Sequence, residues 1–178
     1  MIIWFWPSEL TGVISMALRL ESLETPGHIK SHRVPFSEGY ETVAMSMTWA
    51  LYLIGLYPEV QERIHEELDK VFGEDIDRDA TEEDLNQLNY LHCVLMESNR
   101  IYPIIPMFGR EALEDTVICG STIPKGASCF VSSYFLHRDE NVFPDPEKFD
   151  PDRFSPQNST QIPEGAYVPF SAGPRNCI

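Results

Sequence analysis

A change of periodicity near Pro103 divides the chain into a helical part and a part made of short strands. Before this point apolar residues recur at helical spacing, and after it they lie in short runs separated by Gly and Pro. Helices followed by a small sheet, rather than alternating with strands, indicate a mainly α fold with a minor β portion. A chain of 178 residues with 43% hydrophobic content can form one folded domain.

Three long helices are predicted, over residues 41–57, 58–72 and 88–101. Pro58 is compatible with the first turn of the second helix, and Gly73 is typical of its end. Thr81 and Asp84 have the spacing of a capping box, which predicts a short helix after an exposed acidic loop.

The second part of the chain contains two predicted strands, 116–119 and 127–131, with turns at residues 120–121 and 124–126. From Phe143 onward Pro, Asp and aromatic residues alternate without a period, which indicates an ordered irregular coil. Residues 1–37 carry only weak signals, and we expect them to be poorly ordered.

The charge and the cysteines exclude some classes of function. With 28 acidic and 13 basic residues, the net charge of −15 does not favour binding to nucleic acid or to anionic lipid. Four widely spaced cysteines, without a Cys-x-x-Cys pair, favour neither a zinc site nor a disulfide framework. The apolar runs near the N-terminus are shorter than the ~20 residues that a membrane span needs.

Cys177 lies in the segment Pro-Phe-Ser-Ala-Gly-Pro-Arg-Asn-Cys-Ile. Gly permits close approach of the backbone and Arg favours a thiolate, whereas a free cysteine taken alone is usually a small buried hydrophobe. The spacing Phe-x-x-Gly-x-Arg-x-Cys resembles the haem loop of the cytochrome P-450 family, with matches at Phe170, Gly173, Arg175 and Cys177. The resemblance implies that these residues bind haem and that Cys177 is the axial ligand of its iron.

Glu97 and Arg100 are three residues apart on the third predicted helix, so that their side chains share a face. On an exposed helix such a pair adds only ~0.2–0.5 kcal/mol. In the cytochrome P-450 family a Glu-x-x-Arg pair is buried and joined by an Arg from a Pro-x-Arg-Phe loop, which is similar to residues 151–154 here. The resemblance implies a structural triad of Glu97, Arg100 and Arg153 that supports haem binding.

The segment Glu38-Gly-Tyr-Glu-Thr42 is similar to the family's oxygen-activating helix, in which an acid followed by Thr lies near a Gly. The resemblance implies that Glu41 and Thr42 are catalytic and relay protons to dioxygen at the iron. From the residues alone, an N-terminal acid and a capping Thr of an ordinary helix explain the same pattern.

Three further segments resemble the fatty-acid-hydroxylating subgroup, family four: residues 123–126, 136–139 and 143–154. The resemblance implies that Arg110 and Arg175 contact the haem propionates. In that subgroup the Glu that matches Glu38 can form an ester with a haem methyl group. Tyr40 and Val43 replace the subgroup's usual His and second Thr, which argues against this ester here.

The resemblance covers about residues 38–178 and implies the C-terminal part of the cytochrome P-450 fold, from the C-terminal half of the oxygen-activating helix through the haem-thiolate loop. The implied cofactor is haem (iron protoporphyrin IX). The implied activity is a monooxygenase that inserts one atom of O₂ into a lipophilic, fatty-acid-like or xenobiotic substrate. The implied partner is an NADPH-dependent flavoprotein reductase. The implied location is the cytosolic face of the endoplasmic reticulum membrane, with attachment through an N-terminal region beyond this sequence.

Two other hypotheses stay open. A complete family member is more than twice this long, and the helix expected after Cys177 is replaced by Ile178 alone, whose carboxylate would raise the thiol's pKa. These features predict a catalytically inert truncated chain that acts at most through protein contacts. A zinc hydrolase using His65, His92 or His137 is disfavoured because no His-Glu-x-x-His spacing is present.

Overall fold

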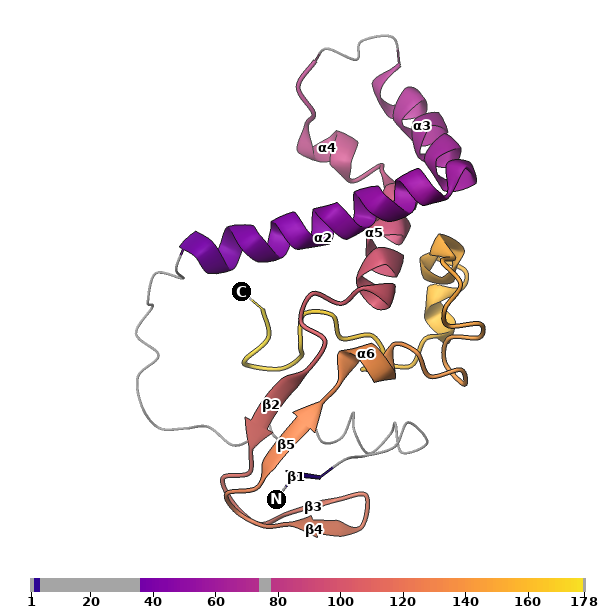
Figure 1. Cartoon of the computed structure of the whole chain (residues 1–178). Helices are drawn as coiled ribbons and strands as arrows, with labels where there is room; N and C mark the ends of the chain where they lie inside the picture. Colours follow the sequence, from indigo (N-terminus) through magenta and orange to yellow (C-terminus); the bar gives the residue numbers. More distant parts are fainter. Residues whose placement is uncertain (1, 4–35, 74–77, 178) are drawn as a thin grey trace.

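The computed structural model describes residues 2–3, 36–73 and 78–177 (Figure 1). Its elements, in chain order, are β1 (Ile2–Ile3), α2 (Phe36–Leu56), α3 (Pro58–Phe72), α4 (Glu82–Leu85), α5 (Asn89–Ile101), β2 (Phe108–Glu111), β3 (Thr116–Ile118), β4 (Ser121–Ile123), β5 (Ser128–Val131), α6 (Ser133–Leu136), η2 (Pro151–Phe154) and η3 (Ser159–Gln161). Three long helices and short strands confirm the prediction of a mainly α fold with a minor β portion.

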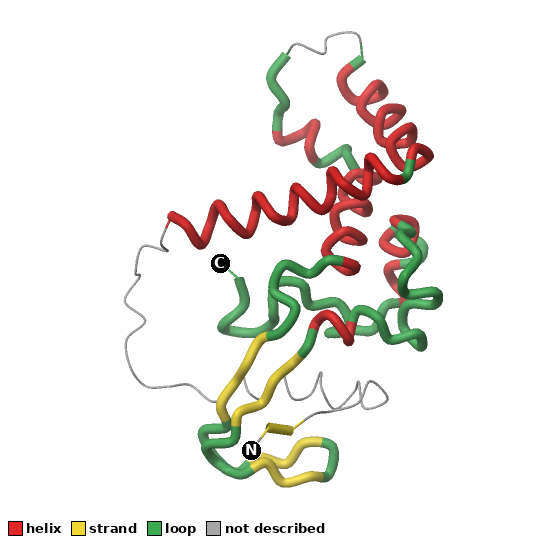
Figure 2. The backbone as a smooth tube through the Cα atoms, in the orientation of Figure 1, coloured by secondary structure: helices red, strands yellow, loops and turns green. Residues whose placement is uncertain are grey.

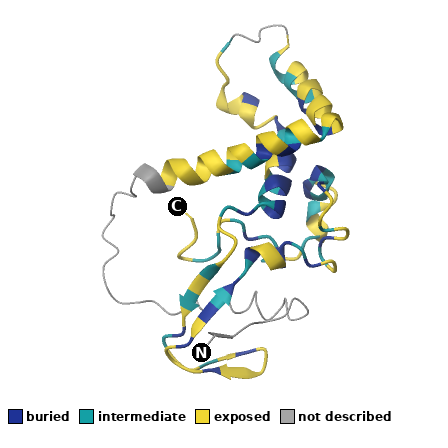
Figure 3. Cartoon of the chain, viewed as in Figure 1, coloured by how far each residue is buried: buried dark blue, intermediate teal, exposed yellow. Residues whose placement is uncertain are grey.

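The helical core forms where α2, α3 and α5 meet (Figure 1). Val60 and Ile64 are one turn apart on α3, and this spacing gives the helix one buried stripe while its other face is charged and exposed (Figure 3). The buried side chains of this cluster are Leu53, Val60, Ile64, Val94, Ile101 and Phe149. Phe149 comes from the coil that follows α6, so the coil closes the core from the side of α5.

α2 begins at Phe36, five residues before the predicted start at residue 41, and includes the whole Glu38–Thr42 segment. Of the region expected to be poorly ordered, residues 1 and 4–35 lie outside the described residues, and the structure does not test the domain boundary at residue 37.

The larger sheet has the order β1-β5-β2, and β5 runs antiparallel to β2 with Arg110 opposite Cys129. The predicted strand 127–131 is β5, but its partner β2 was not predicted. β3 and β4 form a hairpin whose turn residues Cys119 and Gly120 both have positive φ, as a two-residue hairpin turn requires. The turn therefore lies one residue earlier than predicted, because Ser121 already belongs to β4.

After α6 the chain runs mainly as loop to the C-terminal end (Figure 2). Two short 3-10 helices, η2 and η3, interrupt this coil, and Phe143 and Phe154 anchor it against Cys93 of α5. The predicted ordered coil is thus present and packs on the helical core. Among the described residues, no helix has the length and apolar character needed to cross a membrane.

Candidate functional site

Residues 170–177 form a tight loop, called here the Cys177 loop, that folds back on itself. The backbone N–H of Cys177 donates to the carbonyl of Phe170 over 2.9 Å, and Asn176 donates to Gly173 over 3.0 Å. Gly173 has φ +86°, a conformation that glycine adopts without strain, and Ser171 has φ +62°, which is uncommon for a residue with a side chain. The loop closes so that Cys177 and the Phe170 ring are both exposed, the latter by 58%.

Arg110 connects the Cys177 loop to the sheet. Its Nη2 atom donates to Ser171 Oγ over 2.9 Å and to the carbonyl of Arg175 over 3.5 Å. Arg110 lies on β2, opposite Cys129 of β5, so a regular strand fixes the origin of this long side chain. The structure therefore brings the predicted cofactor-binding residue Arg110 next to the loop that contains Arg175 and Cys177.

α2 presents one face toward α5, and Thr42 belongs to that face. Ser46 Oγ donates to Asn99 Oδ1 over 2.9 Å, and the Trp49 ring stacks on Tyr102 with centroids 4.3 Å apart. Because side chains four residues apart share a helix face, Thr42 lies one turn before Ser46 on this side, whereas Glu41 lies on the flank. In Figure 1 this half of α2 extends beyond α5 on the side where the C-terminal end of the chain lies.

The other predicted residues of α2 are less informative. Glu41 and Thr42 are both exposed, and Thr42 Oγ1 donates to the carbonyl of Gly39 over 3.4 Å. The side chain of Glu38 lies outside the described residues, so its predicted ester with haem stays a prediction.

Glu97, Arg100 and Arg153 form a buried charge cluster. Arg100 donates through Nε and Nη2 to the two carboxylate oxygens of Glu97, over 2.7 and 2.9 Å, and both side chains are fully buried. Arg153 Nε lies 3.4 Å from Glu97 Oε1. Burial raises the pKa of the Glu97 carboxyl above its ordinary value, and the donors from Arg100 act in the opposite direction. The structure thus brings the three predicted members together.

This cluster also binds the backbone of the coil. Arg100 donates to the carbonyls of His137 and Lys148, over 2.8 and 3.2 Å, and Glu97 accepts the backbone N–H of Asp150 over 2.9 Å. Three backbone groups from residues 137–150 are therefore held by two side chains of α5. An irregular segment has no strand partner, so such bonds are what fixes its path.

His137 and Tyr167 join the same region; the sequence suggested no role for Tyr167, and named His137 only in the disfavoured zinc hypothesis. His137 Nε2 accepts the backbone N–H of Val168 over 2.9 Å, and Tyr167 Oη donates to the carbonyl of Met96 over 2.8 Å. The His137 ring is fully buried, and its burial lowers its pKa to about 3. The resemblance of residues 136–139 to family four pointed to this segment, but it did not indicate that the His137 ring binds the Val168 N–H.

The zinc hypothesis named His65, His92 and His137. His65 and His92 are exposed on α3 and α5, whereas His137 is buried after α6. Within the described residues, no three His, Cys, Asp or Glu side chains gather as ligands for a metal ion.

The exposed groups of the Cys177 loop match the chemistry of a haem. Haem combines an iron that accepts a thiolate, apolar ring faces and two carboxylates. The exposed Cys177 thiol, the exposed Phe170 ring, and the guanidinium groups of Arg110 and of the exposed Arg175 can supply one partner for each. The residues present therefore fit this cofactor.

The sequence model of the family Cytochrome P450 matches residues 29–178 of this chain. The chain belongs to the cytochrome P450 family. It is 50% identical over 141 residues to Cytochrome P450 4V2 of Homo sapiens, which is 79% of this chain and 27% of that protein. It is 45% identical to Cytochrome P450 4c3 of Drosophila melanogaster, over 79% of this chain and 26% of that protein. These relatives confirm the prediction of a family-four cytochrome P450.

A third relative, Cytochrome P450 4F8 of Homo sapiens, is 40% identical over 79% of this chain and 27% of its own length. The chain thus spans about a quarter of the length of these cytochrome P450 relatives, as the coverage of 26–27% shows. The roles of individual residues at the site are argued below from their positions.

Proposed function

We propose that this chain forms the haem-thiolate part of a monooxygenase, with Cys177 as the axial ligand of the iron. The observation that carries the proposal is the exposed Cys177 in a loop that Arg110 connects to β2, at the end of the coil that the buried charge cluster holds. The chemistry that the haem supplies is insertion of one atom of O₂ into a C–H bond, with electrons from NADPH.

The two arginines have distinct roles in this proposal. Arg110 extends from β2 to the Cys177 loop, and Arg175 lies two residues before the ligand. A guanidinium group can form two parallel hydrogen bonds to a carboxylate, so both residues would bind the propionates. The same positive charges would favour Cys177 as a thiolate. Gly173 and Phe170 would shape the loop and cover the ring face.

Thr42 and Glu41 are the proposed route for protons. Thr42 lies on the face of α2 that continues from Ser46 and Trp49, and its hydroxyl can hold a proton on the side of the Cys177 loop. Glu41 lies on the exposed flank of the helix, where its carboxylate can exchange protons with solvent. Together they would pass a proton from water to the reacting oxygen.

The buried charge cluster has a structural role in the proposal. Glu97 and Arg100 hold the coil that leads to the loop, and Arg153 closes the cluster from η2. None of the three would touch substrate.

The partners follow from the family. We propose a lipophilic substrate, a flavoprotein reductase that uses NADPH, and a location on the cytosolic face of the endoplasmic reticulum membrane. The net charge of −15 does not favour a nucleic acid as partner.

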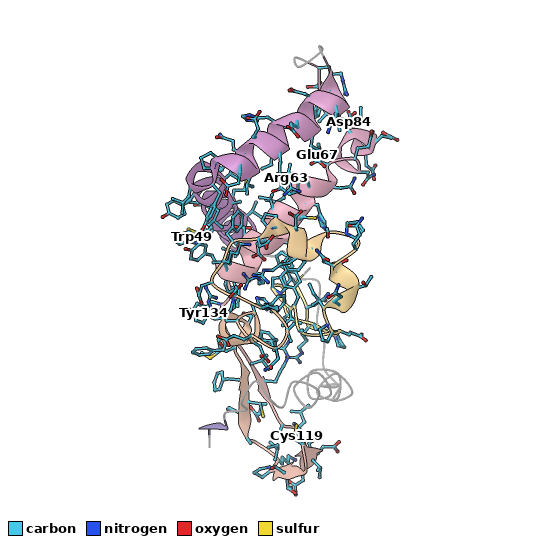
Figure 4. The ribbon with its side chains drawn as sticks, turned by 90° about the vertical axis from the view of Figure 1, so that its right-hand side faces the viewer. Trp49, Arg63, Glu67, Asp84, Cys119 and Tyr134 are labelled. Carbon is cyan, nitrogen blue, oxygen red and sulfur yellow. The ribbon has the colours of Figure 1, made fainter. Side chains whose placement is uncertain are left out.

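The test is spectroscopic. The chain is expressed with a haem precursor, purified, reduced and exposed to carbon monoxide, and the strongly red-shifted Soret band of thiolate-ligated haem is the expected result. Cys177→Ser should abolish this band. Cys119→Ser is the matched control, because Cys119 is also exposed but lies in the turn of the β3–β4 hairpin, at the bottom of the view in Figure 4.

Two results would contradict the proposal. A red-shifted band that persists in Cys177→Ser would mean that another side chain holds the iron. A chain that folds but retains no haem would favour the alternative, a catalytically inert truncated chain. Haem that stays with the polypeptide after acid extraction would support the ester through Glu38.

A further inference from the structure

His137 connects α5 to the segment that enters the Cys177 loop. Its carbonyl oxygen accepts Arg100 Nη1 over 2.8 Å, and its ring Nε2 accepts the backbone N–H of Val168 over 2.9 Å. Residue 137 therefore binds the buried charge cluster through its backbone and the start of the loop through its side chain. Its exposed fraction is 0%, so water does not compete for either bond.

These bonds define the protonation state of the ring. Because Nε2 accepts a hydrogen bond, it carries a lone pair, and the ring proton of the neutral imidazole lies on Nδ1. Nδ1 has no hydrogen-bond partner among residues 2–3, 36–73 and 78–177. Nδ1 is thus buried without a hydrogen bond, while Nε2 binds the Val168 N–H. Buried polar atoms are usually paired, so the single bond at Nε2 is the contact that this side chain makes at the cost of the other.

Backbone hydrogen bonds connect Val168, which His137 holds, to Cys177, the proposed iron ligand. The carbonyl of Val168 accepts the N–H of Ser171 over 3.2 Å, and Phe170, two residues after Val168, accepts the N–H of Cys177 over 2.9 Å. A shift of Val168 would therefore move the acceptor of the Ser171 N–H and, two residues later, the Phe170 carbonyl that accepts the Cys177 N–H. Tyr167 packs its ring 5.1 Å from the His137 ring and donates to Met96, which adds a second connection to α5.

We propose that His137 is a positioning residue that fixes the Cys177 loop by accepting the Val168 N–H. This inference rests on the proposed function, since the loop matters as the holder of the iron ligand. The acceptor atom, and not the ring volume, carries the role. A ring of the same size without an acceptor would fill the space but leave the Val168 N–H unsatisfied in the interior.

The experiment compares His137→Phe with His137→Gln in the full chain loaded with haem. Phe keeps a flat ring against Tyr167 and removes the acceptor, whereas Gln has a side-chain oxygen that can reach the position of Nε2. Tyr167→Phe is the matched control, because it removes the bond to Met96 and leaves the His137 acceptor in place.

Two properties are measured: the hydrogen-exchange rate of the Val168 amide by NMR, and the ratio of thiolate-ligated to neutral-thiol haem in the carbon monoxide spectrum. In His137→Phe we expect Val168 exchange to rise by about tenfold, the equivalent of one lost hydrogen bond. The thiolate fraction should fall in the same variant, because a less well fixed loop leaves the thiolate open to protonation. His137→Gln should restore both properties.

Each outcome decides the inference. Unchanged Val168 exchange in His137→Phe would overturn it, and so would a Gln variant that behaves like the Phe variant, since ring packing alone would then explain the residue. If the wild-type chain binds no haem, the proposed function is wrong, and the proposed role of His137 in positioning an iron ligand is wrong as well. The exchange rates then separately decide whether His137 holds Val168.

Discussion

Replacement of Glu97 by Gln should lower the free energy of unfolding by several kcal/mol, although the two side chains have nearly the same size and differ by one negative charge. Arg100 is fully buried and gives two of its bonds to the Glu97 carboxylate, over 2.7 and 2.9 Å. Gln keeps one acceptor but presents an NH₂ group to a buried guanidinium. An unpaired buried charge of this kind typically costs ~3–5 kcal/mol, compared with ~0.2–0.5 kcal/mol for the same spacing on an exposed helix.

Urea unfolding at neutral pH measures this cost as the difference in free energy of unfolding. The matched control is Asp152→Asn, which breaks a bidentate pair with Arg63 of similar geometry, 2.8 and 2.8 Å, whose side chains are 47% and 50% exposed. An exposed pair contributes about 0–1 kcal/mol, so the control should lose little. If Glu97→Gln costs no more than Asp152→Asn, burial is not what gives the charge cluster its strength.

Replacement of Arg100 by Met tests the same cluster from the other side. Burial already raises the pKa of Glu97, and loss of the guanidinium removes its main opposing influence. A carboxyl with a raised pKa in the folded state binds protons more readily there than when unfolded, so stability falls as pH rises. The cost of Arg100→Met should therefore be smaller at pH 5 than at pH 8, and a cost independent of pH would refute this reasoning.

Two further predictions concern titration and helix capping. The pKa of His137 is about 3 in the folded chain and ordinary when unfolded, so the unfolded state binds the extra proton between these values and stability falls as pH falls. The slope should be about 1.4 kcal/mol per pH unit, absent in His137→Phe, and parallel urea-unfolding profiles of the two proteins would contradict it. Glu67 accepts the N–H groups of Tyr90 and Leu91 at the start of α5, over 2.7 and 2.9 Å, and Figure 4 places it beside Arg63. Glu67→Gln should cost about 1 kcal/mol in urea unfolding, whereas the exposed neighbour Glu66→Gln should cost almost nothing.

Local signals in the sequence were sufficient for α3 and α4, but they missed the first turns of α2 and the short helix α6. α3 spans residues 58–72 as predicted, and the capping box of Thr81 and Asp84 is present with both of its bonds. These signals are Pro in a first helical turn, Gly after a last turn, and a capping pair. Each depends only on residues a few positions apart, so it can be recognised from the sequence alone. β2 was missed because it exists through its pairing with β5, some twenty residues away, and neither periodicity nor turn signals report that contact.

The sequence predicted the residues of the candidate site but not the hydrogen bonds that connect them to the rest of the fold. The spacing of Phe170, Gly173, Arg175 and Cys177 identified the loop, but the bond from Arg110 to Ser171 joins residues 61 positions apart. His137 was considered only as a zinc ligand, and that role was disfavoured because the chain has no His-Glu-x-x-His spacing. Its partner, the N–H of Val168, is a backbone group that no side-chain pattern can indicate.

The buried charge cluster shows why the irregular coil is nevertheless well defined. A helix or strand satisfies its own backbone groups, but residues 137–150 present a buried carbonyl at His137 and part-buried groups at Lys148 and Asp150 without a regular partner. An apolar core at this position would leave the His137 carbonyl unsatisfied, at ~1–3 kcal/mol, and would remove the bonds to the other two groups. One carboxylate and one guanidinium provide both an acceptor and donors in a single place, and their charges compensate each other. The Glu97–Arg100 pair is therefore buried where it can bind the backbone groups of the coil, and these bonds fix the path of the coil.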